Sequence, residues 1–91
     1  MSNTAVIIIK IMPESPSTDL RKIEEQVKHK MEASGAKAVT FEEKEVAFGL
    51  KSITLKMAFP EEKGTDYVEQ EIAKIPHISS VTIEDYRRAF G

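Results

Sequence analysis

The chain has 91 residues, of which 31% are charged, and its formal net charge at pH 7 is −2. This length leaves room for one small domain over residues 1–91, and the slightly acidic balance argues against a general nucleic-acid-binding protein, which needs a basic surface. The absence of cysteine excludes disulfides and thiol chemistry and fits a reducing compartment such as the cytoplasm.

The N-terminal region predicts a central strand. Residues 5–12 are rich in isoleucine and valine on both faces, and Pro13 follows them. A strand that is apolar on both faces is typical of the middle of a sheet. The run is too short to span a bilayer and lacks the form of a signal peptide, so we expect no membrane association.

A helix is predicted next. Thr18 is the expected N-cap, with Asp19 in the first turn, where a carboxylate complements the helix dipole. Gly35 is the expected stop. Apolar residues recur between these points at helical spacing, at Leu20, Ile23, Val27 and Met31.

Two strands are predicted in the middle of the chain. The first covers 37–43, with Val39 and Phe41 facing inward, and the charged run 42–45 predicts a turn at its end. The second covers 50–59 and has the clearest period of two, which indicates one buried and one solvated face. Its inward residues are Ile53, Leu55, Met57 and Phe59.

The C-terminal part predicts a second helix and a last strand. Residues 64–66 are the expected helix start, and Pro76 ends the helix near Lys74. The last strand covers 78–86. The inward residues of this part are Val68, Ile72, Ile75, Val81 and Ile83.

An internal repeat supports the resulting order, β-α-β-β-α-β. The pattern P-E-x-x-x-T-D occurs at 13–19 and at 60–66, and V-T-x-E occurs at 39–42 and at 81–84. We interpret the first pattern as the same turn and cap in two β-α-β halves. The fold class is therefore α+β, a ferredoxin-like two-layer sandwich whose antiparallel sheet has the order 4-1-3-2 and two helices on one face. The open face is expected to carry Val6, Ile8, Lys10, Thr54 and Lys56.

Motifs for catalysis are scarce. The chain has no phosphate-binding glycine loop and no nucleophile elbow, and we interpret His29 and His77 as surface residues without a metal site. Two features remain. Phe48 is either part of the core or a presented contact, and the pair 87–88, both arginine, is either a solvated tail or a functional cation. Because strands three and four run the same way, Phe48 and Arg88 should lie roughly 30 Å apart and cannot form one active site.

Three segments, 46–53, 64–66 and 78–81, resemble the guanine-nucleotide-exchange domain of translation elongation factor 1-beta in its short archaeal form. The resemblance implies a partner, the GTPase elongation factor 1-alpha, and a function in peptide-chain elongation. It implies that Arg88 or Arg87 reaches the magnesium and phosphate site of the partner, and that Phe48, with Gly49 and Lys51, contacts the partner's second domain.

The resemblance further implies an exchange factor that promotes GDP release and GTP rebinding without covalent chemistry. It is expected to be a cytoplasmic monomer without metal or cofactor that binds the GDP-bound and nucleotide-free partner. The alternative is an RNA-binding module of RRM-like fold, which would stack bases on aromatic residues that the central strands lack on their open face. A small phosphatase would need a glycine-containing loop at 13–16, where none is found.

Overall fold

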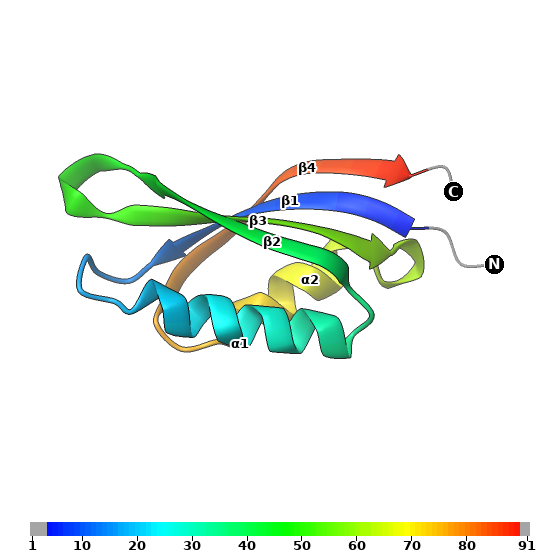
Figure 1. The fold of residues 1–91 in the computed structure, drawn as a ribbon, viewed down its shortest axis with the longest axis horizontal. Helices are drawn as coiled ribbons and strands as arrows, with labels where there is room; N and C mark the ends of the chain where they lie inside the picture. Colours follow the sequence, from blue (N-terminus) through cyan, green and yellow to red (C-terminus); the bar gives the residue numbers. More distant parts are fainter. Residues whose placement is uncertain (1–3, 90–91) are drawn as a thin grey trace.

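The structure, a computed structural model, describes residues 4–89 and has the predicted order of elements (Figure 1). Two short 3₁₀ turns, Ala47–Gly49 and Glu61–Lys63, precede the third strand and the second helix. The strands and helices are β1 (Thr4–Pro13), α1 (Leu20–Ala33), β2 (Lys37–Glu45), β3 (Lys51–Pro60), α2 (Gly64–Ala73) and β4 (Ile78–Ala89).

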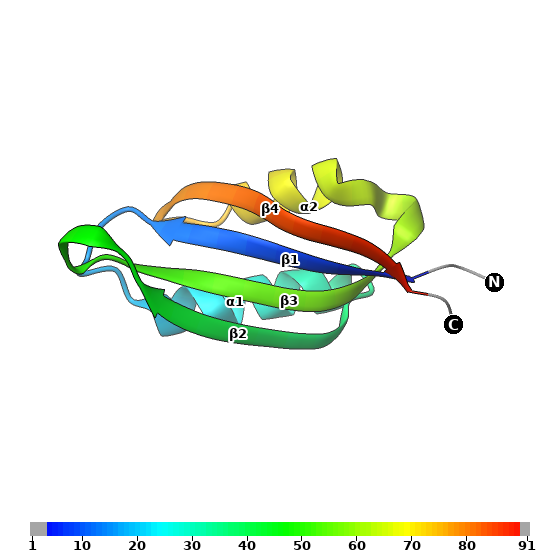
Figure 2. The ribbon, with the colours of Figure 1, turned by 90° about the horizontal axis from the view of Figure 1, so that it is seen from above.

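The four strands form one sheet in the order β2-β3-β1-β4, which is the predicted order seen from the other edge (Figure 2). The pairs β1–β3, β1–β4 and β2–β3 are all antiparallel. Both helices pack on one face of the sheet (Figure 1). The ferredoxin-like α+β prediction is therefore confirmed, with the two most apolar strands at the centre.

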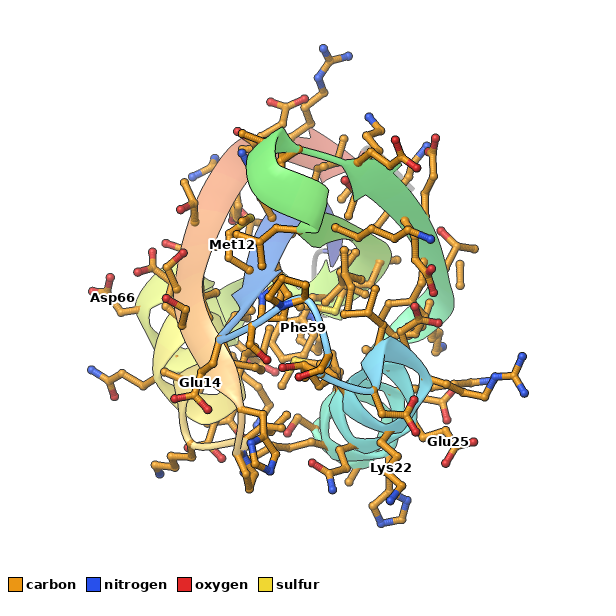
Figure 3. All side chains as sticks on the ribbon, turned by 90° about the vertical axis from the view of Figure 1, so that its left-hand side faces the viewer. Met12, Glu14, Lys22, Glu25, Phe59 and Asp66 are labelled. Carbon is orange, nitrogen blue, oxygen red and sulfur yellow. The ribbon has the colours of Figure 1, made fainter. Side chains whose placement is uncertain are left out.

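The core lies between the sheet and the helices. Viewed along the strands, Phe59 lies between the two layers, whereas Lys22 and Asp66 point outward from the helices (Figure 3). Each fully buried large apolar side chain contributes about 1.5–3 kcal/mol relative to exposure. The buried strand residues alternate as predicted and include Ile7, Ile9, Ile11, Ile53, Leu55, Met57 and Phe59. The helices add Ile23, Val27, Met31, Val68 and Ile72.

The opposite face of the sheet is the predicted open face. Alternation places every second residue of β1 and β3 there, away from the helices. They include the five predicted residues, which are half-buried or, for Lys56, exposed: Val6, Ile8, Lys10, Thr54 and Lys56.

The start of α1 corrects one prediction. The N-cap is Asp19 and not Thr18, because the Asp19 carboxylate accepts hydrogen bonds from the backbone N–H groups of Arg21 (3.1 Å) and Lys22 (3.4 Å). The Thr18 hydroxyl oxygen instead accepts a hydrogen bond from the backbone N–H of Ser15 at 3.3 Å. The turn before the helix therefore uses the threonine, and the aspartate caps the helix.

The end of α1 is as predicted. Gly35 follows the C-cap residue Ser34 and has φ +106°, in the left-handed region that favours glycine. A Cβ on Gly35 would also come within 3.1 Å of Pro60 Cγ. The Ser34 hydroxyl lies 2.8 Å from the Tyr67 hydroxyl, which links the end of α1 to α2.

The hairpin between β2 and β3 is longer than predicted. β2 continues past its predicted end at 43 to Glu45, which lies opposite Lys51. β2 is an edge strand, so its charged side chains reach water on the open edge, and the cross-strand pair has opposite charges. The charged run 42–45 therefore belongs to the strand, and the turn predicted at its end follows at 46–50.

The start of α2 also differs from the interpretation of the repeat. Asp66 lies inside the first turn of the helix, whereas Asp19 caps α1, and no side chain caps α2 at Lys63. The two halves therefore share the strand-ending prolines, Pro13 and Pro60, but not the same cap.

Candidate partner-binding site at two ends of the sheet

The two features singled out in the sequence lie at opposite ends of the sheet. Phe59, near the end of β3, lies opposite Ala5, and Ala5 also lies opposite Arg88 of β4. The Ala47–Gly49 turn precedes the start of β3 at the other end (Figure 1). Ten residues of β3 separate the two ends, or roughly 30 Å of strand, in a molecule 44 Å long. The predicted separation is confirmed.

The hairpin end consists of residues 46–51. The Val46 N–H donates a hydrogen bond to the Leu50 carbonyl at 2.8 Å, and the Leu50 N–H donates one to the Ala47 carbonyl at 3.2 Å. Gly49 has φ +75°, and a Cβ there would meet no atom within 4 Å, so glycine is needed for its backbone conformation and not for space. The side chain of Phe48 lies outside the described residues, so the choice between core and contact stays a prediction.

A groove of about 480 Å³ lies beside the hairpin end. Gly49 and Lys51 line it from the hairpin, Glu43 lines it from β2, and Arg21 lines it from α1. Charges of both signs therefore surround the two predicted contact residues, Gly49 and Lys51.

Glu43 also faces Glu24 of α1. As two ionised carboxylates they have no proton to share, and Glu24 Oε2 is buried without a hydrogen-bond partner. Desolvation by burial, and then a hydrogen bond to Glu43 and repulsion from its charge, raise the pKa of Glu24 to about 7, against a smaller opposing effect of Arg21. At a pH below about 7, a proton on Glu24 supplies the donor that two carboxylates lack.

Domain stability should therefore depend on pH through Glu24. In the folded state its pKa is about 7, against an ordinary value of 4.5, so folding favours the protonated form and stability falls as pH rises through this window. We expect a loss of about 1 kcal/mol, less than full linkage gives, because solvent screens this site. Urea unfolding at about pH 5 and about pH 8 measures it.

The Glu24→Gln variant should lose this contribution to the pH dependence, whereas Glu25→Gln, at an exposed position on the same helix, should keep it. A difference between wild type and Glu24→Gln that stays constant from about pH 5 to about pH 8 would contradict the assignment.

The arginine end consists of residues 85–88 together with Glu61. The pairing of β1 with β4 shifts by one residue between Ile8 and Ile9, so that Glu84 is an extra, bulged residue. Ile83 faces the helices opposite Ile9, and beyond the bulge Arg88 lies opposite the inward residue Ala5. The bulge thus reverses which residues of β4 face the helices.

The side chains follow this register. Arg88 Nε lies 2.6 Å from Glu61 Oε1, on the side of α2. Arg87 Nε lies 2.9 Å from Asp85 Oδ2, and Asp85 is opposite Ile8 on the open face. The two neighbouring arginines therefore project from opposite faces of the sheet.

The Arg88 guanidinium is held at its base and open at its tip. The contact with Glu61 uses Nε, and 72% of the Arg88 side chain is exposed, whereas Glu61 is only 17% exposed. A mostly buried carboxylate thus forms an ion pair with the base of an exposed cation.

Residues 6–89 match the sequence family described as the EF-1 guanine nucleotide exchange domain. The chain belongs to this family. It is 38% identical over 81 residues to "Elongation factor 1-beta" of Haloarcula marismortui, covering 88% of this chain and 91% of the relative. It is 35% identical over 89 residues to the protein of the same name from Methanosphaera stadtmanae, covering 97% and 98%. The resemblance stated from the sequence is confirmed.

Both glutamates of the Pro-Glu part of the internal repeat contact residues next to or in β4. Glu14, after Pro13, lies 3.4 Å from His77 Nδ1 at the start of β4. Glu61, after Pro60, binds Arg88 at the end of β4. The two glutamates therefore lie next to opposite ends of the same strand, which the internal repeat alone did not indicate.

Residues 4–89 contain no group of three or more histidine, cysteine or acidic side chains arranged to bind a metal ion. Neither α1 nor α2 has the length and apolar composition that a membrane span requires. His29 is exposed on α1, and His77 is exposed in the turn before β4, so both are surface residues as predicted.

Proposed function

We propose that the protein promotes release of GDP from elongation factor 1-alpha and rebinding of GTP, with Arg88 as the cation that acts at the partner's magnesium and phosphate site. Membership of the exchange-domain family supports the activity. The observation that favours Arg88 is its exposed guanidinium, held in one direction by Glu61. Arg87 projects from the other face and is paired with Asp85.

The proposed mechanism needs no covalent step. A guanidinium that approaches the site of Mg²⁺ repels that cation and competes for the phosphate oxygens of the nucleotide. By linkage, a protein that binds the nucleotide-free GTPase more tightly than the GDP-bound form must lower GDP affinity by the same factor. The abundant nucleotide, GTP, then fills the empty site.

The hairpin end supplies the second contact in this proposal. Phe48, Gly49 and Lys51 bind the partner's second domain, and the length of β3 sets the distance between the two contacts. We further propose that the protein acts as a monomer in the cytoplasm and binds both the GDP-bound and the nucleotide-free partner.

The test is the release of fluorescently labelled GDP from the cognate elongation factor 1-alpha in the presence of excess unlabelled nucleotide. The protein should raise the release rate by roughly tenfold or more, saturating with concentration. An unchanged release rate at saturating protein would reject the proposed function. A parallel titration with single-stranded RNA in moderate salt tests the RRM-like alternative, for which the open face offers no aromatic residue on β1 or β3, because Phe59 is buried.

A further inference from the structure

The exposed large apolar side chains lie at the two ends already described. Among the residues whose burial is described, these are Val46, at the hairpin end, and Tyr86, at the arginine end, each 36% exposed. Tyrosine is enriched at the energetically important positions of protein interfaces. Neither residue was singled out from the sequence, and Tyr86 is the one with a defined hollow beside it.

The bulge in β4 turns Tyr86 toward α2. Tyr86 lies opposite Ile7, whose side chain is buried on the helix side of the sheet. Simple alternation from the inward residue Ile83 would have placed Asp85 there instead. Tyr86 and Arg88 consequently share one face of β4.

A hollow of about 350 Å³ lies between β4 and the start of α2. Ile83 and Tyr86 line it from the strand, and Gly64 and Thr65 line it from the helix. A Cβ on Gly64 would meet no atom within 4 Å, so the space next to this residue is open. The floor is apolar, because Ile83 packs against the core.

The hollow adjoins the ion pair of the arginine end. Glu61 lies in the 3₁₀ turn that leads directly into Gly64, and Arg88 follows Tyr86 by two residues on the same face. An apolar hollow next to an exposed guanidinium matches the usual composition of an interface centre, in which apolar and aromatic anchors lie close to arginine.

We propose that this hollow, formed by Ile83, Tyr86, Gly64 and Thr65, receives an apolar side chain of the GTPase from the domain that holds the nucleotide. The proposal rests on the proposed function, since the continuity of the hollow with Arg88 identifies the occupant. It adds that the GTPase approaches the arginine end from the side of α2 and not from the open face of the sheet. Tyr86 then acts as an anchor that determines affinity, whereas Arg88 acts on the nucleotide.

The experiment measures two quantities for each variant: the Kd for nucleotide-free elongation factor 1-alpha and the rate of labelled-GDP release at saturating exchange factor. Tyr86→Ala removes the anchor, and Thr65→Trp fills the hollow while Tyr86 stays in place. Both should weaken binding by roughly tenfold or more, with the saturating release rate within about twofold of wild type. Tyr86→Phe, which keeps the ring, should bind like wild type.

The matched control is Thr82→Ala, an exposed position on the open face of the same strand, opposite Lys10. It should leave both quantities unchanged, and thermal unfolding shows whether each variant is folded. Unchanged affinity in folded Thr65→Trp overturns the proposal, whether or not Tyr86→Ala binds weakly, because the hollow is then not occupied. Failure of the proposed function gives a different result, since the wild-type protein then does not raise the rate of GDP release from elongation factor 1-alpha.

Discussion

Replacing Arg88 with alanine is expected to lower the maximum rate of GDP release from elongation factor 1-alpha by about tenfold or more. A factor of this size corresponds to a typical coupling free energy between two binding sites. The reason is the direction of its side chain. Glu61 holds the guanidinium at Nε with a contact of 2.6 Å and leaves most of the side chain exposed. Because the lost interaction acts on the nucleotide site, the loss should appear in the maximum rate more than in the affinity.

Arg87→Ala is the matched control, since it removes the same charge one residue away but from the opposite face. It should keep its release rate within about twofold of wild type, as expected for an exposed ion pair. Arg88→Lys should retain part of the activity, because it keeps the charge but not the geometry of the guanidinium. Full activity in Arg88→Ala together with lost activity in Arg87→Ala would contradict this prediction, because Arg87 would then be the cation that acts on the nucleotide site.

Glu61 gives a further check on the same prediction. Glu61→Gln keeps a polar oxygen next to Arg88 Nε without the charge, whereas Glu61→Ala removes the contact. If the buried carboxylate positions the cation, the alanine variant should release GDP more slowly than the glutamine variant at saturation. An equal rate in both would mean that Arg88 finds its direction in the complex without Glu61.

The sequence predicted the architecture because apolar residues recur with the regular periods of strands and helices. Alternation in β3 and β1 identified the buried residues, and helical spacing identified the stripe at Ile23, Val27 and Met31. The errors occurred where local chemistry offered two choices. Thr18 and Asp19 are both good caps, and only the turn before the helix, where Thr18 bonds to Ser15, decides between them.

The site was less predictable, for a physical reason. The sequence placed the aromatic turn and the arginines at opposite ends, which follows from strand direction alone. It could not say which of Arg87 and Arg88 faces the helices, because that depends on the extra residue Glu84 in the pairing of β4 with β1. A bulge of one residue reverses the faces of everything beyond it, and nothing in the local sequence of β4 marks its position.

Other residues became visible only through contacts between distant segments. Glu24 and Glu43 are 19 residues apart in the chain and meet between α1 and β2. Tyr86 meets Gly64 and Thr65 across the hollow. The sequence did contain one usable signal, the Pro-Glu pair of the internal repeat, since Glu61 binds Arg88 and Glu14 binds His77. It was interpreted as part of a cap and not as a contact to the last strand.

Phe48→Ala is expected to weaken binding to elongation factor 1-alpha by roughly tenfold while leaving the maximum release rate nearly unchanged. The reason is the proposed contact of Phe48 with the partner's second domain. Since Phe48 is proposed to contact the partner, Phe48→Ala should change the free energy of unfolding by less than about 0.5 kcal/mol. A buried phenylalanine would instead cost about 3–5 kcal/mol. Leu55→Ala, at a fully buried position, provides the reference for a core loss, and chemical unfolding measures all three proteins.

The distance between the two ends makes the double variant informative. Residues at the hairpin end and at the arginine end are separated by the length of β3, so their effects should add in free energy unless the ends communicate. Phe48→Ala combined with Arg88→Ala should therefore show the affinity loss of the first and the rate loss of the second. A double variant no worse than Arg88→Ala alone would mean that the hairpin end contributes nothing once the cation is absent. The two ends would then not be independent contacts on one GTPase.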